Sequence, residues 1–352
     1  MYDINGNAVN VAYDLSGNIV YRRYTEEYKL NHNNCIYRGK LRKTGNYLVD
    51  QYGERIQLRG IGLHSILQYK NLHTKAAFES LKAYGINCIR ISVYLSDFSF
   101  KHSDGLRQAG YINAPDETKA EIERIVSLCV DLGLYAIIDW HTMQEDVTDG
   151  IIAYRDESVA FFEYFAEKYA DTPNVLYELQ NEPYTSVKDS LGPYVKAQRD
   201  AIVKYVDDPV MIVGSRGGYI GNTVTYVESY GVTDVFYSAH FYSDSLTTDV
   251  FGGAVAAIPF ICTEWSNASE SPTATGGNAE ACNAFMDYAY AHKISICSWK
   301  FTDQTHVFSV LKNRGAINDS YYSDGFTDDD LTAWGKLFFE NNKKYNFVSD
   351  LE

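Results

Sequence analysis

The sequence alternates short apolar segments with longer amphipathic ones, and the number of alternations constrains the fold. Eight segments are typical of β-strands, and they lie near residues 57–61, 86–93, 134–140, 175–182, 209–214, 235–242, 258–264 and 294–299. Apolar runs this short, bounded by Pro and polar residues, are typical of strands covered on both faces. Eight β/α units in about 300 residues favour a closed (β/α)₈ TIM barrel over an open doubly wound sheet. The GxGxxG phosphate loop of a doubly wound fold is also absent from the sequence.

Helix signals are clearest in two of the intervening segments. Residues 116–132 place apolar side chains on one stripe, with Asp116 expected to cap the amino end and Gly133 to end the helix. A last helix is expected over residues 328–344, because three aspartates in its first turn and two lysines in its last match the helix dipole.

The first residues carry an internal repeat with a period of 11. Tyr2-Asp3-Ile4-Asn5-Gly6-Asn7 is answered by Tyr13-Asp14-Leu15-Ser16-Gly17-Asn18, and each copy indicates a tight turn between short β segments. Two copies cannot build a core alone. We therefore predict a short β-hairpin-type extension over residues 1–44 and a (β/α)₈ catalytic domain over residues 45–352, which opens with a hairpin over residues 45–58.

Composition limits the classes of partner. The 352 residues are 45% hydrophobic and 14% aromatic, which is ample for one large packed domain. A formal charge of −15 without a Lys/Arg cluster argues against nucleic acid or an anionic membrane, but it is compatible with a neutral polymer. No apolar run reaches the roughly 18 residues of a membrane span, and the start at Met1 shows no charged-then-apolar signal peptide.

The six cysteines are interpreted as thiols, because none forms a CxxC or another metal-type spacing. Cys88, Cys262 and Cys297 each lie two residues before a candidate site residue on a predicted strand. The two-residue period of a strand predicts that each of them faces inward with that residue, as small apolar filling.

Two glutamates stand at the ends of predicted buried strands, Glu182 in Leu179-Gln180-Asn181-Glu182-Pro183 and Glu264 in Ile261-Cys262-Thr263-Glu264-Trp265. Most glutamates of such a chain are solvated helix residues, but a charge at the mouth of a buried strand is costly unless it is used. Cleavage of a bond between two sugars needs a proton for the departing oxygen and a carboxylate to meet the positive charge on the ring. Glu182 and Glu264 are the candidates for these two roles.

Other polar residues gather at the same ends of the predicted strands. Strands two, three, four, six, seven and eight close with Arg90, His141, Asn181 and Glu182, His240 and Tyr242, Glu264, and Trp299, respectively. Reactive groups of (β/α)₈ barrels lie at the carboxyl ends of the strands, so these side chains are expected to meet at one site.

With these motifs the chain resembles glycoside hydrolase family 5, the family of many endo-β-1,4-glucanases, over roughly residues 45 to 340. The resemblance rests on Leu58-Arg59-Gly60 with His64, Asn87-Cys88-Ile89-Arg90, Asp139-Trp140-His141, Tyr177-Glu178-Leu179-Gln180-Asn181-Glu182-Pro183, His240-Phe241-Tyr242, Thr263-Glu264-Trp265 and Ser298-Trp299. It implies a retaining mechanism with Glu182 as acid/base and Glu264 as nucleophile, and it implies no cofactor and no metal. Asn181 resembles the family residue that hydrogen-bonds the sugar 2-hydroxyl.

The residues around the pair fit these roles. Arg90 and a hydrogen bond from Tyr242 would favour the charged form of Glu264, whereas partial burial and the charge of Glu264 would help Glu182 to hold a proton. His141 and His240 would line the same subsite. Trp299 is expected to form a platform beneath the sugar ring.

The sequence departs from the family around the outer subsites. His64-Ser65-Ile66-Leu67-Gln68-Tyr69 stands where a related cellulase often has a tryptophan, so Tyr69 is the expected stacking residue there. Gly217-Gly218-Tyr219 and Lys300-Phe301-Thr302-Asp303 differ from the usual strings after strands five and eight. Mannan, xyloglucan or mixed-linkage glucan therefore stay open as substrates beside β-1,4-glucan.

Two other classes of protein are alternatives. A metal-dependent barrel hydrolase would use His64, Asp139, His141 and His240 as ligands, but a cationic Arg90 beside a metal would be unfavourable. A carbohydrate-binding protein without catalysis would not need the intact carboxylate pair. The expected partner is a polysaccharide, and the expected state is a secreted monomer.

Overall fold

The computed structural model describes residues 38–97, 109–216, 220–242, 258–266, 278–314 and 321–344, together with the backbone of two strands near the amino terminus. These two strands, β1 (Val9–Tyr13) and β2 (Ile19–Tyr24), pair antiparallel. The predicted turns of the repeat lie outside the described residues. The division of the chain at residue 44 stays a prediction, and strand β3 (Arg42–Thr44) pairs with β4 (Tyr47–Val49) across it.

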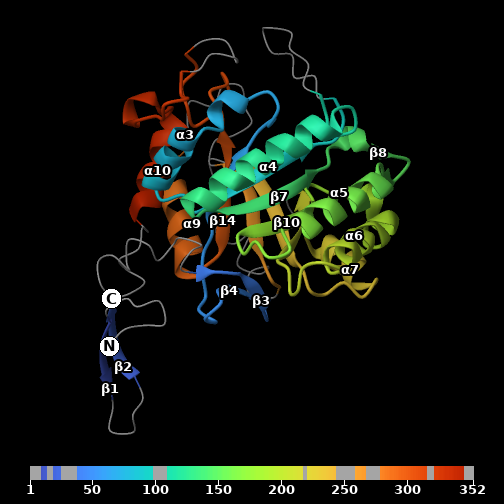
Figure 1. The fold of residues 1–352 in the computed structure, drawn as a ribbon, viewed down its shortest axis with the longest axis horizontal. Helices are drawn as coiled ribbons and strands as arrows, with labels where there is room; N and C mark the ends of the chain where they lie inside the picture. The colour runs from blue at the N-terminus through green and yellow to red at the C-terminus, as the bar shows by residue number, and fades with distance from the viewer. Residues whose placement is uncertain are drawn as a thin grey trace.

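Eight parallel strands close into a barrel in the order β10-β11-β12-β13-β14-β5-β6-β7, which confirms the predicted fold class (Figure 1). The strands are β5 (Arg59–Leu63), β6 (Cys88–Tyr94), β7 (Tyr135–His141), β10 (Val175–Gln180), β11 (Met211–Arg216), β12 (Phe236–Tyr242), β13 (Ile261–Ser266) and β14 (Ser295–Phe301). The ends of each strand lie within three residues of those of its predicted segment, because buried parallel strands are nearly continuous apolar runs.

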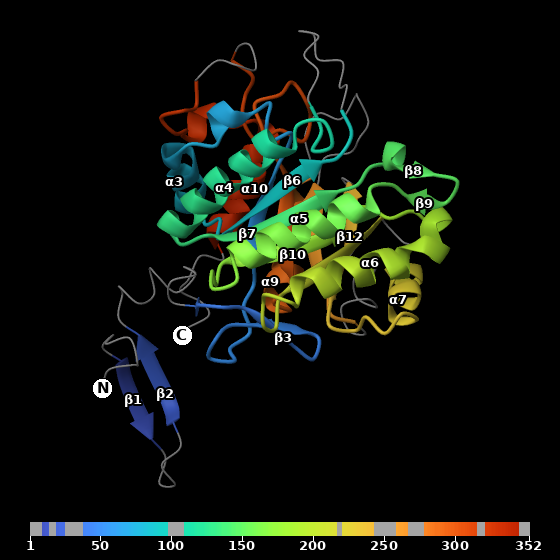
Figure 2. The same cartoon turned by 45° about the vertical axis from the view of Figure 1, so that its right-hand side comes forward.

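Helices surround the barrel, as the two views in Figures 1 and 2 show. They are α3 (Lys75–Ala83), α4 (Pro115–Leu132), α5 (Arg155–Lys168), α6 (Lys188–Ile202), α7 (Ile220–Glu228), α9 (Ala279–Ala291) and α10 (Ala333–Lys344). Short 3₁₀ turns at Lys70–Leu72, Gln144–Asp146, Thr185–Val187 and Asp328–Asp330 and a small hairpin of β8 (Val147–Thr148) and β9 (Ile151–Ile152) lie in the connections. A large apolar cluster joins the outer faces of the strands to the helices, and a second cluster fills the barrel interior below the site.

Two predicted helix starts are wrong. Pro115 opens α4 and Ala114 precedes it without a side-chain cap, so Asp116 lies inside the first turn. Gly133 ends this helix in the left-handed region at φ 68°, as predicted. At the carboxyl end, Asp328–Asp330 form a separate 3₁₀ turn, and α10 begins only at Ala333.

The hairpin predicted over residues 45–58 is displaced toward the amino terminus. Its strands are β3 and β4, with Gly45 in the turn at φ 57°. The predicted second strand, which includes Ile56, contributes only the isolated bridge between Val49 and Arg55 and a hydrogen bond from the Ile56 amide to Leu48.

The cysteines of the described residues are free thiols, as predicted. Cys88 and Cys297 face the barrel interior and flank Gly60 of the strand between them. The expectation for Cys262 is wrong, because this residue packs in the outer apolar cluster. The register of β13 shifts between Cys262 and Trp265, which breaks the two-residue alternation just before Glu264.

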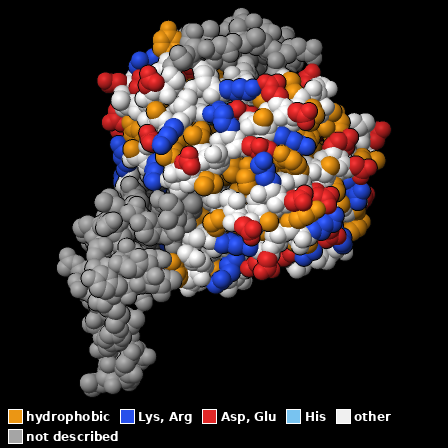
Figure 3. Space-filling model, in the orientation of Figure 1, with side chains coloured by type: hydrophobic (Ala, Val, Ile, Leu, Met, Phe, Trp, Pro, Cys, Tyr) orange, Lys and Arg blue, Asp and Glu red, His pale blue; other side chains and the backbone are white. Residues whose placement is uncertain are grey.

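On the face drawn in Figure 3, acidic and basic side chains are interspersed over the helices. Within the described part of the chain, no helix combines the length and the apolar character that crossing a membrane requires.

Candidate active site

The barrel brings the predicted site residues together toward the carboxyl ends of its strands, although Arg90 lies inside its strand rather than at the end. Arg90 lies in β6, His141 ends β7, His240 and Tyr242 lie in β12, Glu264 lies in β13 and Trp299 lies in β14, while Asn181 and Glu182 directly follow β10. Some of these strands are not neighbours in the sheet. Their side chains meet in one site because the sheet closes into a barrel.

The two glutamates face each other closely. One carboxylate oxygen of Glu182, one of Glu264 and a ring nitrogen of His240 lie within 4.8 Å of one another. The side chain of Glu182 is 17% exposed and that of Glu264 is 6% exposed. Glu182 therefore lies nearer the solvent, and Glu264 is embedded in the hydrogen-bonded floor of the site.

Arg90 organises this floor. Its guanidinium donates from Nη1 to Glu264 Oε2 at 2.6 Å and from Nη2 to Asn181 Oδ1 at 2.7 Å. Two further hydrogen bonds go to Glu178, from Nε to Oε2 at 2.7 Å and from Nη2 to Oε1 at 3.0 Å, and Asp139 Oδ2 lies 2.9 Å from Nη2. Arg90 has no exposed surface, so these contacts are what compensate its buried charge.

Burial and charge act against each other in this cluster. Burial opposes the positive charge of Arg90, but Asp139, Glu178 and Glu264 hold its pKa well above the ordinary value. Burial raises the pKa of Asp139 to about 7 and that of Glu178 above its usual range, although Arg90 opposes both shifts. The floor of the site is thus a network in which buried carboxyls outnumber the cation that they surround.

His240 contacts the acid/base candidate. Its Nδ1 lies 3.0 Å from Glu182 Oε1, and its Nε2 lies 2.8 Å from the hydroxyl of Thr263. Burial lowers the proton affinity of this imidazole, but the charge of Glu264 and the hydrogen bond with Glu182 raise its pKa overall. At this distance one proton can bridge His240 Nδ1 and the carboxyl group of Glu182.

Two further side chains hold the reacting groups. The hydroxyl of Tyr242 donates to Glu264 Oε1. Burial and the charge of Glu264 raise the pKa of Tyr242 well above its ordinary value, so this phenol keeps its proton. Asn181 accepts from Arg90 and donates from Nδ2 to the Thr142 carbonyl at 3.1 Å, which fixes the orientation of its amide.

Aromatic rings form one wall of the site. The rings of Trp299 and His141 are nearly parallel, with 6° between their planes and 5.8 Å between their centroids. His64 lies edge-on to Trp299 at 5.6 Å. Tyr69 lies behind His64 at 6.0 Å and has no exposed surface, so the prediction that Tyr69 stacks on a sugar is wrong. Burial and the charge of Arg90 lower the pKa of His141 to about 3, so this imidazole is neutral.

Glycines of the barrel make room for the site. A Cβ at Gly62 would lie 2.7 Å from the ring of Trp299, so the absence of a side chain in β5 allows this indole into the barrel mouth. At Gly214 in β11, a Cβ would lie 1.8 Å from the carbonyl oxygen of Asn181 and 2.6 Å from that of Gln180. The backbone that leads to Glu182 therefore rests directly on this glycine.

Gly214→Ala is expected to impair both stability and turnover. The clash is with backbone that cannot yield locally, so the free energy of unfolding should fall by about 1–3 kcal/mol. Displacement of Glu182 should lower kcat by about tenfold or more. Gly221→Ala in α7 is the matched control, because nothing lies within 4 Å of its added Cβ. Thermal unfolding and kcat would be measured for both variants, and equal kcat values would contradict the expectation.

Several residues of the site were not predicted as such. Asp139, Glu178 and Thr263 form its buried floor, and Tyr94 packs between His64 and His141 at 5.3 and 4.4 Å. The two-residue strand period could have found Asp139, which lies two positions before His141 on the same face. Glu178 is harder to place, because the register of β10 shifts between this residue and Gln180.

Lys300, one of the departures from the family pattern, lies beside the site. It is 2% exposed, and its ammonium donates to Gln304 at 2.7 Å and lies 5.8 Å from the ring of Trp299. Burial lowers the pKa of Lys300 to about 7, and the negative charge of Glu264 opposes this shift only in part.

The site offers ligand atoms for a metal, but they are not the set expected of a metal-dependent barrel hydrolase. Glu182, His240 and Glu264 could converge on one ion. Glu264, however, is already bound to the Arg90 guanidinium, which would repel a cation. Of the proposed ligands, Asp139 is engaged by Arg90 and by His141 Nδ1 at 2.6 Å. The donor set therefore fits a hydrogen-bonded carboxylate pair better than a metal centre.

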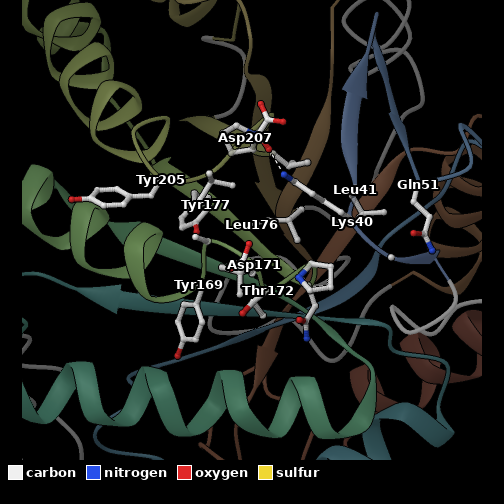
Figure 4. Close-up of a pocket in the computed structure, with 18 of the residues that line it drawn as sticks. Lys40, Leu41, Gln51, Tyr169, Asp171, Thr172, Leu176, Tyr177, Tyr205 and Asp207 are labelled. Atoms are coloured by element: carbon white, nitrogen blue, oxygen red, sulfur yellow. Dashed lines mark hydrogen bonds between the residues drawn. The ribbon is translucent and has the colours of Figure 1, made fainter.

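A cavity of about 810 Å³ opens at the opposite, amino-terminal end of the barrel (Figure 4). Its lining includes Lys40, Tyr169, Tyr177, Tyr205 and Asp207, and Lys40 donates to the Asp207 carbonyl. None of the predicted site residues lines it, and reactive groups of such barrels lie at the other face.

A (β/α)₈ barrel that presents two facing carboxylates at its carboxyl-terminal end has the architecture of a barrel-type glycoside hydrolase. The chain belongs to the cellulase family, glycosyl hydrolase family 5, whose model matches residues 49–305.

Known relatives agree with this assignment. The chain is 27% identical over 318 residues to an endoglucanase of Clostridium saccharobutylicum, covering 88% of this chain and 66% of that protein. It is 26% identical over 311 residues to Endoglucanase 5 of Pectobacterium carotovorum, covering 86% of this chain and 57% of that protein. The chain thus spans less than two thirds of the length of these curated relatives.

Solved structures share the fold. The cellulase Cel5C_n matches with a TM-score of 0.72 and 27% identity, over 88% of this chain and 94% of that one. The catalytic domain of a Thermobifida fusca endoglucanase, in complex with cellotetraose, matches with a TM-score of 0.73 and 22% identity, over 88% of this chain and 99% of that one.

Proposed function

We propose that the protein is a retaining endo-β-1,4-glycanase, and that its substrate is a β-1,4-glucan. The observation that carries the proposal is the approach of Glu182 and Glu264 to within 4.8 Å. Carboxyl groups about 5–5.5 Å apart suit a double displacement, whereas an inverting enzyme needs about 6.5–9.5 Å to admit a water.

The contacts of each glutamate support different roles. Glu264 accepts from Arg90 and Tyr242, and these two hydrogen bonds hold its carboxyl group in a fixed position, as a nucleophile requires. Glu182 lies at hydrogen-bond distance from the imidazole of His240, and it is the more exposed of the two glutamates. It can therefore protonate the departing oxygen and later activate a water, as an acid/base must.

The surrounding groups would hold one sugar ring. The face of Trp299 offers a platform for the apolar side of a pyranose, with His141 and His64 beside it. Asn181, fixed by Arg90, lies next to Glu182 and can hydrogen-bond the 2-hydroxyl. Endoglucanase relatives and a structural neighbour that binds cellotetraose favour a glucan as the polymer.

Reducing sugar released from a panel of β-glycans tests this proposal. Carboxymethylcellulose and barley β-glucan are expected to be cleaved faster than xyloglucan and mannan, with internal cuts that lower viscosity early. The same rates are expected after dialysis against EDTA, because no step needs a metal. Loss of activity in EDTA that Zn²⁺ restores would instead support the metal-dependent hydrolase, and polymer binding without any release of sugar would support a binding protein.

The remaining proposals concern the whole protein. We propose that it acts outside the cell, since a polysaccharide cannot cross a membrane, and that it acts as a monomer on its polymer. Residues 1–44 are proposed as an extension separate from the catalytic domain of residues 45–352.

A further inference from the structure

Glu178 is a third glutamate of the site, and neither the reaction nor the sequence motif assigns it a task. It has no exposed surface and lies below both catalytic glutamates, so it cannot contact a substrate. The charged and titratable groups that face it from the neighbouring strands are Cys88 and Arg90 of β6, Asp139 and His141 of β7 and His240 of β12. A buried carboxyl in this position is costly unless its contacts are used.

One set of contacts leads to the nucleophile. The two oxygens of Glu178 grip Nε and Nη2 of Arg90, at 2.7 and 3.0 Å. This fork fixes the rotation of the planar guanidinium. Its Nη1 is then directed at Glu264, at 2.6 Å.

The other set of contacts leads to the acid/base. Thr263 donates its hydroxyl proton to Glu178 Oε1 at 2.7 Å, because a carboxylate can only accept. The Thr263 oxygen then accepts from His240, so the ring nitrogen Nε2 carries a proton. The other nitrogen, Nδ1, must therefore share a single proton with Glu182 Oε1, 3.0 Å away.

We propose that Glu178 is a positioning residue that connects the two catalytic glutamates. Through Arg90 it orients the charge that faces the nucleophile. Through Thr263 and His240 it fixes the direction of the hydrogen bonds that keep a proton beside the acid/base. The inference rests on the proposed function, because it assigns Glu178 a part in that same double displacement.

Glu178→Gln tests both branches while keeping the shape of the side chain. Loss of the negative charge favours the ionised forms of the catalytic pair, so both limbs of the kcat/KM profile against pH should move to lower pH, by about one unit. An amide also cannot accept from every donor that meets Glu178, so kcat should fall by about tenfold or more while KM changes little.

Thr263→Val separates the branches, because it removes the hydroxyl between Glu178 and His240 and leaves the Arg90 fork intact. The alkaline limb alone is expected to move in this variant. Glu121→Gln is the matched control, since Glu121 is also buried and hydrogen-bonded but lies away from the site, against His73 and Arg124. It should lose stability without a shift of either limb.

The outcomes separate the inference from the proposed function. If Glu178→Gln only lowers the unfolding temperature, as Glu121→Gln does, and its pH profile matches that of the wild type, Glu178 is merely structural and the inference is overturned. Failure of the proposed function would show differently, as a wild-type protein that cleaves no β-glycan. Should Glu178→Gln not fold, Thr263→Val decides, because an unmoved alkaline limb in that variant also overturns the inference.

Discussion

Replacing Glu264 with alanine is expected to abolish turnover while leaving sugar binding intact. The carboxylate that forms the glycosyl ester is gone, so kcat should fall by at least about four orders of magnitude, which is about 5 kcal/mol of transition-state stabilisation. Cellotetraose affinity should change little, because the aromatic wall and Asn181 remain. Reducing-sugar release and isothermal titration calorimetry measure the two effects.

Rescue of Glu264→Ala by azide tests whether the missing carboxylate is the nucleophile. In Glu264→Ala the small anion can enter the vacated space and attack an activated aryl β-glycoside once, which gives a glycosyl azide of inverted configuration. Glu121→Ala is the control, because it also removes a buried carboxylate but should keep nearly full kcat. A retained azide product from Glu264→Ala, or no rescue together with substantial residual turnover, would show that another group is the nucleophile.

Glu182→Ala should affect substrates according to their leaving groups. A glucan departs as a poor leaving group and needs the proton, so cleavage of polymer should slow by about 10²- to 10⁴-fold. A dinitrophenyl glycoside departs without protonation and should form the glycosyl-enzyme at nearly the normal rate. The measurement is the ratio of kcat/KM for the dinitrophenyl glycoside to kcat/KM for the glucan, in the wild type and in Glu182→Ala.

Azide again provides a contrast for Glu182→Ala. Here it would attack the glycosyl ester on Glu264, so two inversions give a product of retained configuration. Glu145→Ala is the control for a glutamate on the same face, since Glu145 is exposed in the turn after β7. If polymer and aryl glycoside slowed equally in Glu182→Ala, the residue would not be the acid.

The barrel could be predicted because buried parallel strands and amphipathic helices have different apolar periods, and eight alternations admit few closed folds. The same alternation also predicted where each strand ends, and reactive groups of such barrels lie at those ends. Glu182 and Glu264 stand near the points where apolar runs stop, and a charge at such a point is conspicuous in a sequence. Arg90 lies inside β6 rather than at its end, so the prediction that it closes this strand is wrong. The structure brings these three together through contacts between strands far apart in the chain.

What lies below the strand ends could not be predicted in the same way. Glu178 sits inside an apolar strand, and its partners Arg90 and Thr263 belong to other strands, so only the closed barrel shows why its charge is tolerated. Register shifts also break the rule that side chains two residues apart in a strand face the same side. Cys262 precedes Glu264 by two positions, yet it faces outward. The prediction that Asp116 caps α4 was wrong for a local reason, because Pro115 takes the first helical position.

The hydrogen-bonded supports of the two glutamates described here come from strands β6, β10, β12 and β13. The geometry of the reaction centre is therefore set largely by the strands rather than by the connections between them. Exchange of loops between relatives could therefore change which branched polymer such an enzyme accepts, while the hydrogen bonds and protons of the catalytic residues stay the same. The loops at the rim of the barrel are the natural place for engineering.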